Sequence, residues 1–217
     1  MLMKKLETKA DNRRRRASGF SLVEMAITMA ILIITAVVSV VSLVPMVNAQ
    51  HVTNAYNTTL AALRQARDCS VSQRTSYQVT FNQVVGHPTN IAVTGTLAFA
   101  GDPCTVTFQY PTDVFFLVPP AGTAGPDSYG SGLNAVDFGY TASSASGGQT
   151  TIYFCPDGSA QTASTCSGAG NWDGGVVYLA QNGNVGSFRA VDLWGGTGRV
   201  HGWRLYPNGG TYQWLRQ

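Results

Sequence analysis

The chain has 217 residues, with 14 basic and 11 acidic side chains and a formal net charge of +3. Seven of the basic side chains and two of the acidic ones lie within residues 1–19. The rest of the sequence has seven arginines, no lysine and nine acidic residues, so it carries a net charge of −2. The missing lysine excludes a P-loop, and the G-x-S-x-G elbow of hydrolases does not occur. The overall basicity gives no reason to expect nucleic-acid binding.

The N-terminal region combines a basic block with a long apolar run. Arg13–Arg16 precede Gly19, and residues 20–63 contain a single charged side chain, Glu24. Residues 20–44 are mostly apolar and long enough to cross a bilayer. A lone carboxylate at membrane depth costs about 2.5–3.5 kcal/mol on insertion scales. We therefore expect Glu24 to have a partner and a function.

This arrangement resembles the class III leader of type IV prepilins and of type II secretion pseudopilins. The resemblance implies that a prepilin peptidase cleaves after Gly19 and methylates the new N-terminus at Phe20. It also implies that Glu24 pairs with the terminal ammonium of a neighbouring subunit during filament assembly. Elementary electrostatics agrees, because a buried charge is tolerated when an opposite charge meets it.

A conventional secretory signal is the competing interpretation. Val47-Asn48-Ala49 resembles its cleavage site, and cleavage there would release a soluble β protein that begins at Gln50. However, the apolar run exceeds the roughly 7–15 residues of an ordinary signal, and a carboxylate inside it is atypical. We therefore expect processing at Gly19.

The basic block also predicts the orientation of the chain. Basic residues before a membrane segment hold that end in the cytoplasm, which predicts a single-pass inner-membrane protein with a periplasmic head. In that compartment the four cysteines are expected to pair, and three connectivities are possible. Cys155 with Cys166 would close a short loop and leave Cys69 with Cys104, and we favour this pairing. The cysteines and histidines lack metal-ligand spacing, so we expect no metal and no cofactor.

Beyond the apolar run, helical spacing continues at Val52, Tyr56, Leu60 and Leu63. The sequence predicts one helix from about Ser21 to Ser72, roughly 80 Å long, which bends at Pro45. The predicted parts are a leader (1–19), a membrane or filament-core half of the helix (20–45), its amphipathic half (46–74) and a β-rich head (75–217).

The head consists of short strand-like runs separated by Gly, Pro, Asn and Asp. The runs are 77–81, 106–110, 114–118, 150–154, 176–179, 188–191, 200–205 and 212–215. The segment 119–149, rich in Gly, Ser and Pro, is expected to be a long loop. The predicted fold class is therefore α+β and pilin-like, with the long helix packed on an antiparallel β-sheet head.

The later half of the chain has a second resemblance. The motif Phe154-x-Pro156-x-Gly158, the strand 175–179 and the late Gly198-Arg199-Val200 are similar to the GspH/FimT family of minor pseudopilins and minor pilins. The similarity covers the leader, the helix and the last third of the chain. Residues 82–149 have no counterpart in it.

The C-terminal arginines raise the question of DNA binding. In the FimT branch a G-R-x-R motif is associated with DNA binding during natural transformation, but here His201 stands in the second arginine position. Strand alternation places Arg199 and His201 on one face and Arg204 on the other, whereas a phosphate-binding patch needs its cations together. An amphipathic terminal strand explains the pattern more simply. Turn chemistry likewise explains Asp173, Asn182 and Asn184 better than calcium binding.

The sequence therefore predicts a structural subunit and no enzyme. It would be a minor pseudopilin or minor pilin of a type II secretion pseudopilus or a type IV pilus, and end in a periplasmic or extracellular filament. Its expected partners are other pilin subunits, the prepilin peptidase, the inner-membrane assembly platform and membrane lipid. The alternatives are a DNA-binding minor pilin and a secreted soluble β protein.

Overall fold

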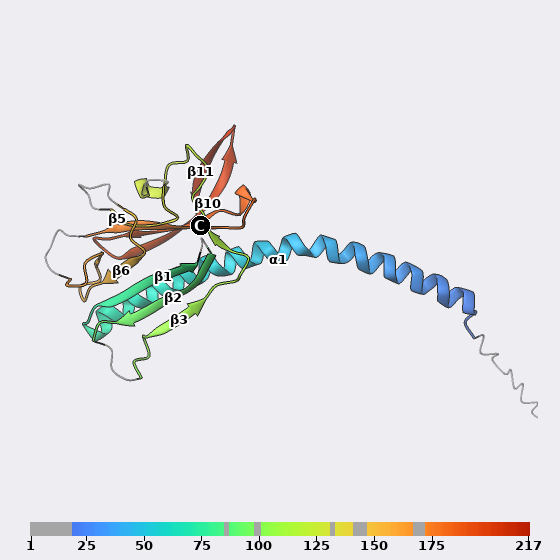
Figure 1. Ribbon diagram of the computed structural model, residues 1–217, viewed down its shortest axis with the longest axis horizontal. Helices are drawn as coiled ribbons and strands as arrows, with labels where there is room; N and C mark the ends of the chain where they lie inside the picture. The colour runs from blue at the N-terminus through green and yellow to red at the C-terminus, as the bar shows by residue number, and fades with distance from the viewer. Residues whose placement is uncertain (1–18, 85–86, 98–100, 131–132, 141–146, 167–171) are drawn as a thin grey trace, which may run out of the picture. The chain divides into compact units, whose positions relative to one another are not determined.

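The computed structural model describes residues 19–84, 87–97, 101–130, 133–140, 147–166 and 172–217. It contains one long α-helix followed by antiparallel β-sheets, which confirms the predicted α+β, pilin-like fold class (Figure 1). The chain divides into two compact units, Met1–Val44 and Pro45–Gln217. The second unit holds the later part of the helix and both sheets.

Helix α1 spans Leu22–Gln73, within one residue of the predicted bounds at each end, and Pro45 lies inside it without ending it. All described side chains between residues 20 and 39 are exposed. The later part of the helix instead buries one face, made of Val52, Ala55, Tyr56, Leu60, Ala62, Leu63 and Ala66. Its alanines present little side chain, which lets the helix lie close to the sheets.

The first sheet has five strands in the order β3-β2-β1-β6-β7, and all its pairs are antiparallel. The strands are β1 (Tyr77–Val84), β2 (His87–Gly95), β3 (Val106–Gln109), β6 (Thr151–Phe154) and β7 (Ala160–Gln161). Alternate residues of β1 (Tyr77, Val79 and Phe81) are buried, as expected for a strand with one face on the core.

The second sheet has the order β11-β10-β9-β8-β4, and β5 also pairs with β8. Its strands are β4 (Phe115–Phe116), β5 (Val136–Tyr140), β8 (Gly174–Ala180), β9 (Arg189–Trp194), β10 (Arg199–Asn208) and β11 (Thr211–Arg216). Every residue of β8 is buried, because both faces of this strand are covered. Val177 and Leu179 join the main core, while Val176 and Tyr178 pack with Tyr129 on the other face.

The main core lies among α1 and the two sheets. Gly202 in β10 allows a close approach of the Tyr56 side chain of α1 to the second sheet. A Cβ at this position would lie 2.5 Å from Tyr56 Cζ, and closer still to the Tyr56 hydroxyl. Tyr56 is itself buried, so the ring has little room to move away.

Three strands were not predicted. The segment 119–149 was expected to be a loop, and that prediction was wrong for β5; a short 3₁₀ turn, η1 (Pro126–Ser128), also lies in it. Asp137 and Gly139 interrupt the apolar residues of β5, so the sequence shows no strand pattern there. The carboxylate of Asp137 is nevertheless satisfied inside the protein, because Tyr140 Oη donates to it at 2.7 Å and Gly148 N at 2.6 Å. Strands β2 and β7 were also missed.

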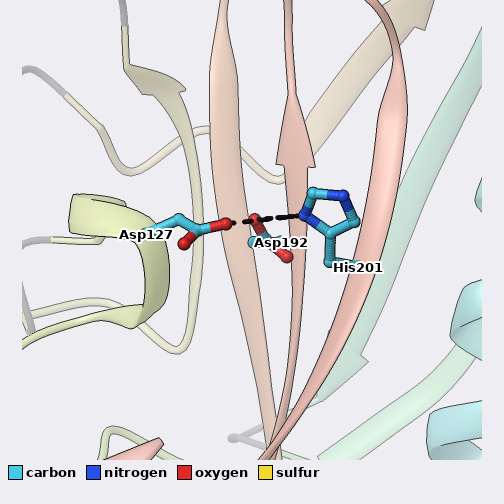
Figure 2. A group of neighbouring side chains, drawn as sticks. All are labelled: Asp127, Asp192 and His201. Carbon is cyan, nitrogen blue, oxygen red and sulfur yellow. Dashed lines mark ion pairs between the residues drawn. The ribbon is translucent and has the colours of Figure 1, made fainter. Parts of the chain in front are cut away.

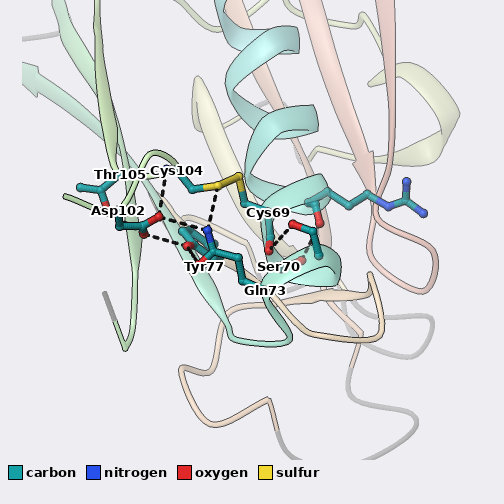
Figure 3. The surroundings of a disulfide bond; sticks show 9 residues. Cys69, Ser70, Gln73, Tyr77, Asp102, Cys104 and Thr105 are labelled. Atoms are coloured by element: carbon teal, nitrogen blue, oxygen red, sulfur yellow. Dashed lines mark hydrogen bonds between the residues drawn. A yellow bond between two sulfur atoms is a disulfide. The ribbon is translucent and has the colours of Figure 1, made fainter. Parts of the chain in front are cut away.

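Two disulfides join Cys69 to Cys104 and Cys155 to Cys166, the pairs that we favoured from the sequence. The Cα–Cα distances are 6.1 Å and 5.6 Å, within the usual range for a disulfide. Cys69 lies near the end of α1 and Cys104 precedes β3, so the first bond ties the end of the helix to the first sheet (Figure 3).

A hydrogen-bond network surrounds Asp102 beside this disulfide (Figure 3). Its carboxylate accepts hydrogen bonds from Tyr77 Oη (2.7 Å), Cys104 N (3.0 Å), Gln73 Nε2 (3.1 Å) and Thr105 Oγ1 (3.1 Å). Burial alone would raise the pKa of Asp102, but these hydrogen bonds outweigh it and lower the pKa. Burial, helped by the bond to Asp102, raises the pKa of Tyr77 to about 12.

Candidate functional site

The residues singled out by the leader pattern lie at the start of α1. Gly19 and Phe20 precede the helix and are exposed, and the Phe20 side chain is 75% accessible. Glu24 lies in the first turn of the helix. It has no hydrogen-bond or ion-pair partner among the described residues. This arrangement leaves the Gly19–Phe20 peptide bond accessible and the Glu24 carboxylate available to another molecule.

Three hydroxyl groups of the apolar helical run are satisfied within the helix itself. Thr28 Oγ1 donates to Met25 O at 3.0 Å, Thr35 Oγ1 to Ile31 O at 3.0 Å, and Ser39 Oγ to Thr35 O at 2.8 Å. Bonds of this kind allow Ser and Thr to occupy a helix in an apolar environment. Glu24 is the one charged side chain of this run, and no bond of this kind satisfies its carboxylate among the described residues.

Among the described residues, α1 is the one helix that is long and apolar enough to cross a membrane. The large side chains of Phe20 and of the first part of α1 are all exposed in the isolated chain. They are Phe20, Leu22, Val23, Met25, Ile27, Met29, Ile31, Leu32, Ile33, Ile34, Val37 and Val38. An apolar surface of this size marks a site of contact with lipid or protein.

The structure separates the three residues considered for DNA contact. Arg199 and His201 line a surface cleft together with Arg64, Arg67 and Arg216, and Asp68 also lines it. Arg67 is partly committed to the fold, because its Nε donates to Thr197 O at 3.0 Å. The cleft nevertheless gathers arginines from α1, β10 and β11, an arrangement that the sequence did not predict.

Arg204 lies in another cleft, with Arg189 and the helix residues Gln50 and Asn54. Its guanidinium carbon lies 5.0 Å from the centre of the Tyr206 ring, which is within cation–π range. Burial lowers the pKa of Arg189, and the neighbouring charge of Arg204 lowers it further. Arg204 therefore does not extend the arginine group around Arg199.

His201 faces two carboxylates that sequence reasoning missed (Figure 2). Its Nδ1 atom lies 3.5 Å from Asp192 Oδ2 and 3.5 Å from Asp127 Oδ2. Asp192 is fully buried, and Trp203 Nε1 donates to its Oδ1 at 2.7 Å. Burial raises the pKa of Asp192, while the bond from Trp203 and the nearby His201 oppose this rise.

Part of this cluster could have been found in the sequence. Strands β9 and β10 form a hairpin around a Gly-Gly-Thr-Gly turn, and their register places Asp192 opposite His201. Because residues opposite each other on one face of a hairpin are neighbours, the turn alone predicts this pair. Asp127 comes from η1, and the sequence has no signal that brings it to the hairpin.

The leader region matches a known family model. The model for the prokaryotic N-terminal methylation motif matches residues 14–42, which include Gly19, Phe20 and Glu24. Comparison with curated proteins and with solved structures finds no match. The methylation motif, the apolar helix and the antiparallel β head together support a type IV pilin-like structural subunit with a single N-terminal membrane anchor.

Proposed function

We propose that this chain is a minor pseudopilin or minor pilin that assembles into a type II secretion pseudopilus or a type IV pilus. The observation that carries the proposal is the exposed apolar start of α1, whose one charged side chain, Glu24, lies at a fixed spacing from the Gly19–Phe20 bond. The match to the methylation motif covers this same region. The GspH/FimT-like motifs of the head favour a minor subunit.

The apolar surface explains both states of such a subunit. Full burial of one Leu, Ile, Val or Met side chain is worth about 1.5–3 kcal/mol. Residues 20–38 carry a dozen large apolar side chains that are exposed in the isolated chain. In the membrane, lipid covers them, and in a filament the helices of other subunits cover them. Transfer of the helix from the membrane to the filament therefore exposes little apolar surface to water.

Glu24 then provides the specificity that apolar contacts lack. Hydrolysis of the Gly19–Phe20 bond creates an α-ammonium group on Phe20. Placed in an apolar filament core, this group needs a negative partner, and the Glu24 carboxylate of a neighbouring subunit supplies it. Loss of either charge leaves the other one buried and unpaired, which costs about 3–5 kcal/mol.

A substitution at Glu24 tests this role. Glu24→Ala and Glu24→Gln should insert into the membrane normally but fail to enter filaments, because both remove the charge. Thr28→Val is the matched control, since the Thr28 hydroxyl is bonded to its own helix, and it should assemble like the natural chain. The measurement is the amount of subunit in sheared filaments relative to that in membranes. Normal incorporation of Glu24→Gln would contradict the proposal.

The mass of the N-terminal peptide separates this proposal from the secreted-protein alternative. In a host with a prepilin peptidase, the membrane-bound chain should begin at N-methylated Phe20. A chain that begins at Gln50 would instead indicate an ordinary exported protein and would remove the role given to Glu24.

DNA binding is a second candidate function, favoured by the arginine-lined cleft around Arg199. A gel-shift assay of the full chain in detergent with single-stranded DNA, at two salt concentrations, tests it. Arg199→Ala together with Arg216→Ala should weaken binding, and the natural chain should bind more weakly at higher salt. Equal binding by the double variant and the natural chain would exclude the cleft.

A further inference from the structure

Three side chains from separate elements converge on the face of the second sheet that lies opposite the main core. Val191 and Leu193 of β9 belong to the core, so Asp192 between them faces the other way. His201 stands opposite Asp192 on β10, and Asp127 approaches from η1 (Figure 2). The one ligand atom that each offers lies within 4.8 Å of the other two.

Direct hydrogen bonds between His201 and the two carboxylates do not account for this cluster. The two Nδ1–oxygen distances are 3.5 Å, longer than the usual 2.7–3.2 Å or so of an N–H···O bond. Asp192 Oδ2 and both ring nitrogens of His201 are buried without a hydrogen-bond partner in the described part of the chain. Buried polar atoms without a partner are rare because leaving them unpaired is costly. The cluster therefore lacks a component that would bind all three groups.

A small metal ion would supply that component. Zn²⁺ binds His nitrogen and Asp oxygen at about 2.0–2.2 Å, which places neighbouring ligand atoms about 3.3–3.5 Å apart around a tetrahedral ion. The distances from His201 Nδ1 to Asp127 Oδ2 and to Asp192 Oδ2 have this length. The bond from Trp203 Nε1 to Asp192 Oδ1 holds the carboxylate and leaves Oδ2 free to bind an ion, and outer partners orient ligands in this way in metal sites.

We propose that Asp127, Asp192 and His201 bind one divalent transition-metal ion of the Zn²⁺ class, through Oδ2, Oδ2 and Nδ1 respectively. The imidazole ligand favours Zn²⁺ over Ca²⁺ and Mg²⁺, which prefer oxygen ligands. Water would complete the coordination. The ion would fasten η1 to the β9–β10 hairpin and so stabilise the head. This proposal departs from the expectation of no metal site, which considered only local spacing of cysteines and histidines.

The segment around Asp127 is built for close approach to the sheet. Gly130 packs against Tyr178, since a Cβ on it would lie 2.6 Å from Val176 and close to the Tyr178 hydroxyl. Asp127 itself has a φ of 48°, in the left-handed region that favours Gly, Asn and Asp. Asn therefore tolerates the backbone at this position and removes only the charge of the ligand.

Zinc binding by the full chain in detergent tests the proposal. The protein is purified without a histidine tag, stripped of metal with a chelator, and titrated with ZnCl₂ in competition with a chromophoric chelator. We expect one Zn²⁺ per chain. Asp127→Asn should weaken binding at least tenfold. Asp113→Asn is the matched control, because it alters another Asp–His pair, at 2.8 Å from His51, and should leave the affinity unchanged.

Two further measurements keep the test independent of one variant. At a free Zn²⁺ concentration one hundred times Kd, the Tm of the natural chain should rise by about 5–11 °C, and Ca²⁺ or Mg²⁺ should not raise it. Co²⁺ should give the visible absorption of a low-coordinate site, and His201→Gln should remove it. Absence of saturable Zn²⁺ binding, or equal affinity in Asp127→Asn and the natural chain, would overturn the proposal. The three groups would then share a proton instead of a metal ion.

Discussion

The two disulfides should stabilise the head to different extents because they close loops of different length. Cys69 and Cys104 are separated by 35 positions, and Cys155 and Cys166 by 11. The entropy of loop closure in the unfolded chain gives about 3.8 kcal/mol for the longer loop and about 2.8 kcal/mol for the shorter. Replacing both cysteines of the first pair with alanine should therefore destabilise the head more than replacing both of the second.

The two pairs share one contact and differ in their packing. Each has a sulfur that accepts a hydrogen bond from a glutamine amide, from Gln73 to Cys104 at 3.3 Å and from Gln161 to Cys155 at 2.9 Å. Cys69 and Cys104 also pack in the main core, whereas Cys155 and Cys166 are not part of that cluster, so lost packing adds to the effect of the longer loop.

Thermal unfolding followed by tryptophan fluorescence measures the effect on the head alone. All four tryptophans belong to it, at Trp172, Trp194, Trp203 and Trp214. For a unit of this size, about 1 kcal/mol corresponds to roughly 2–4 °C in Tm. We expect Tm to fall by about 8–15 °C without Cys69–Cys104 and by about 6–11 °C without Cys155–Cys166. A larger fall for the shorter loop would refute the loop-entropy argument.

Two further predictions concern the contact between α1 and the sheets and the network at its end. Gly202→Ala should lower the free energy of unfolding by about 1–3 kcal/mol, because the new methyl group overlaps with Tyr56. Gly186→Ala is the control and should leave Tm nearly unchanged, because its Cβ would meet no atom closer than 3.5 Å. Equal losses of Tm in the two variants would contradict the packing argument. The second prediction concerns pH, because the pKa of Asp102 is lowered in the folded chain. The Asp102 carboxylate therefore stabilises the fold above the usual carboxyl pKa, and this stabilisation is lost as pH falls through the lowered pKa. The difference in Tm between the natural chain and Asp102→Asn should therefore shrink between pH 7 and pH 3, and a constant difference would argue against this linkage.

Local patterns predicted most of the fold. The bounds of α1 followed from one apolar run and one helical period, both of which depend on neighbouring residues. Strand β2 was missed because Pro88, Thr89 and Asn90 occupy its first half. Strand β7 has only two residues, Ala160 and Gln161, and its pairing with β6 depends on the tertiary structure.

The candidate sites were predictable to different degrees. Gly19, Phe20 and Glu24 form a linear motif whose chemistry depends on spacing alone, so the sequence was sufficient to identify it. The alternation of β10 likewise separated Arg199 from Arg204. The approach of Asp127 to the β9–β10 hairpin depends on the path of a glycine-rich segment, which no periodic pattern specifies.

The bond between Cys69 and Cys104 also determines how the head withstands mechanical force. A pull on α1 toward its N-terminus acts on side chains such as Tyr56 and Leu63, whose packing resists sliding only through weak, separately breakable contacts. Because Cys69 lies four positions before the last residue of the helix, the same pull also acts through a covalent bond on the first sheet. An oxidised head therefore resists slippage of its helix through a covalent bond, whereas a reduced head resists it through packing and hydrogen bonds alone.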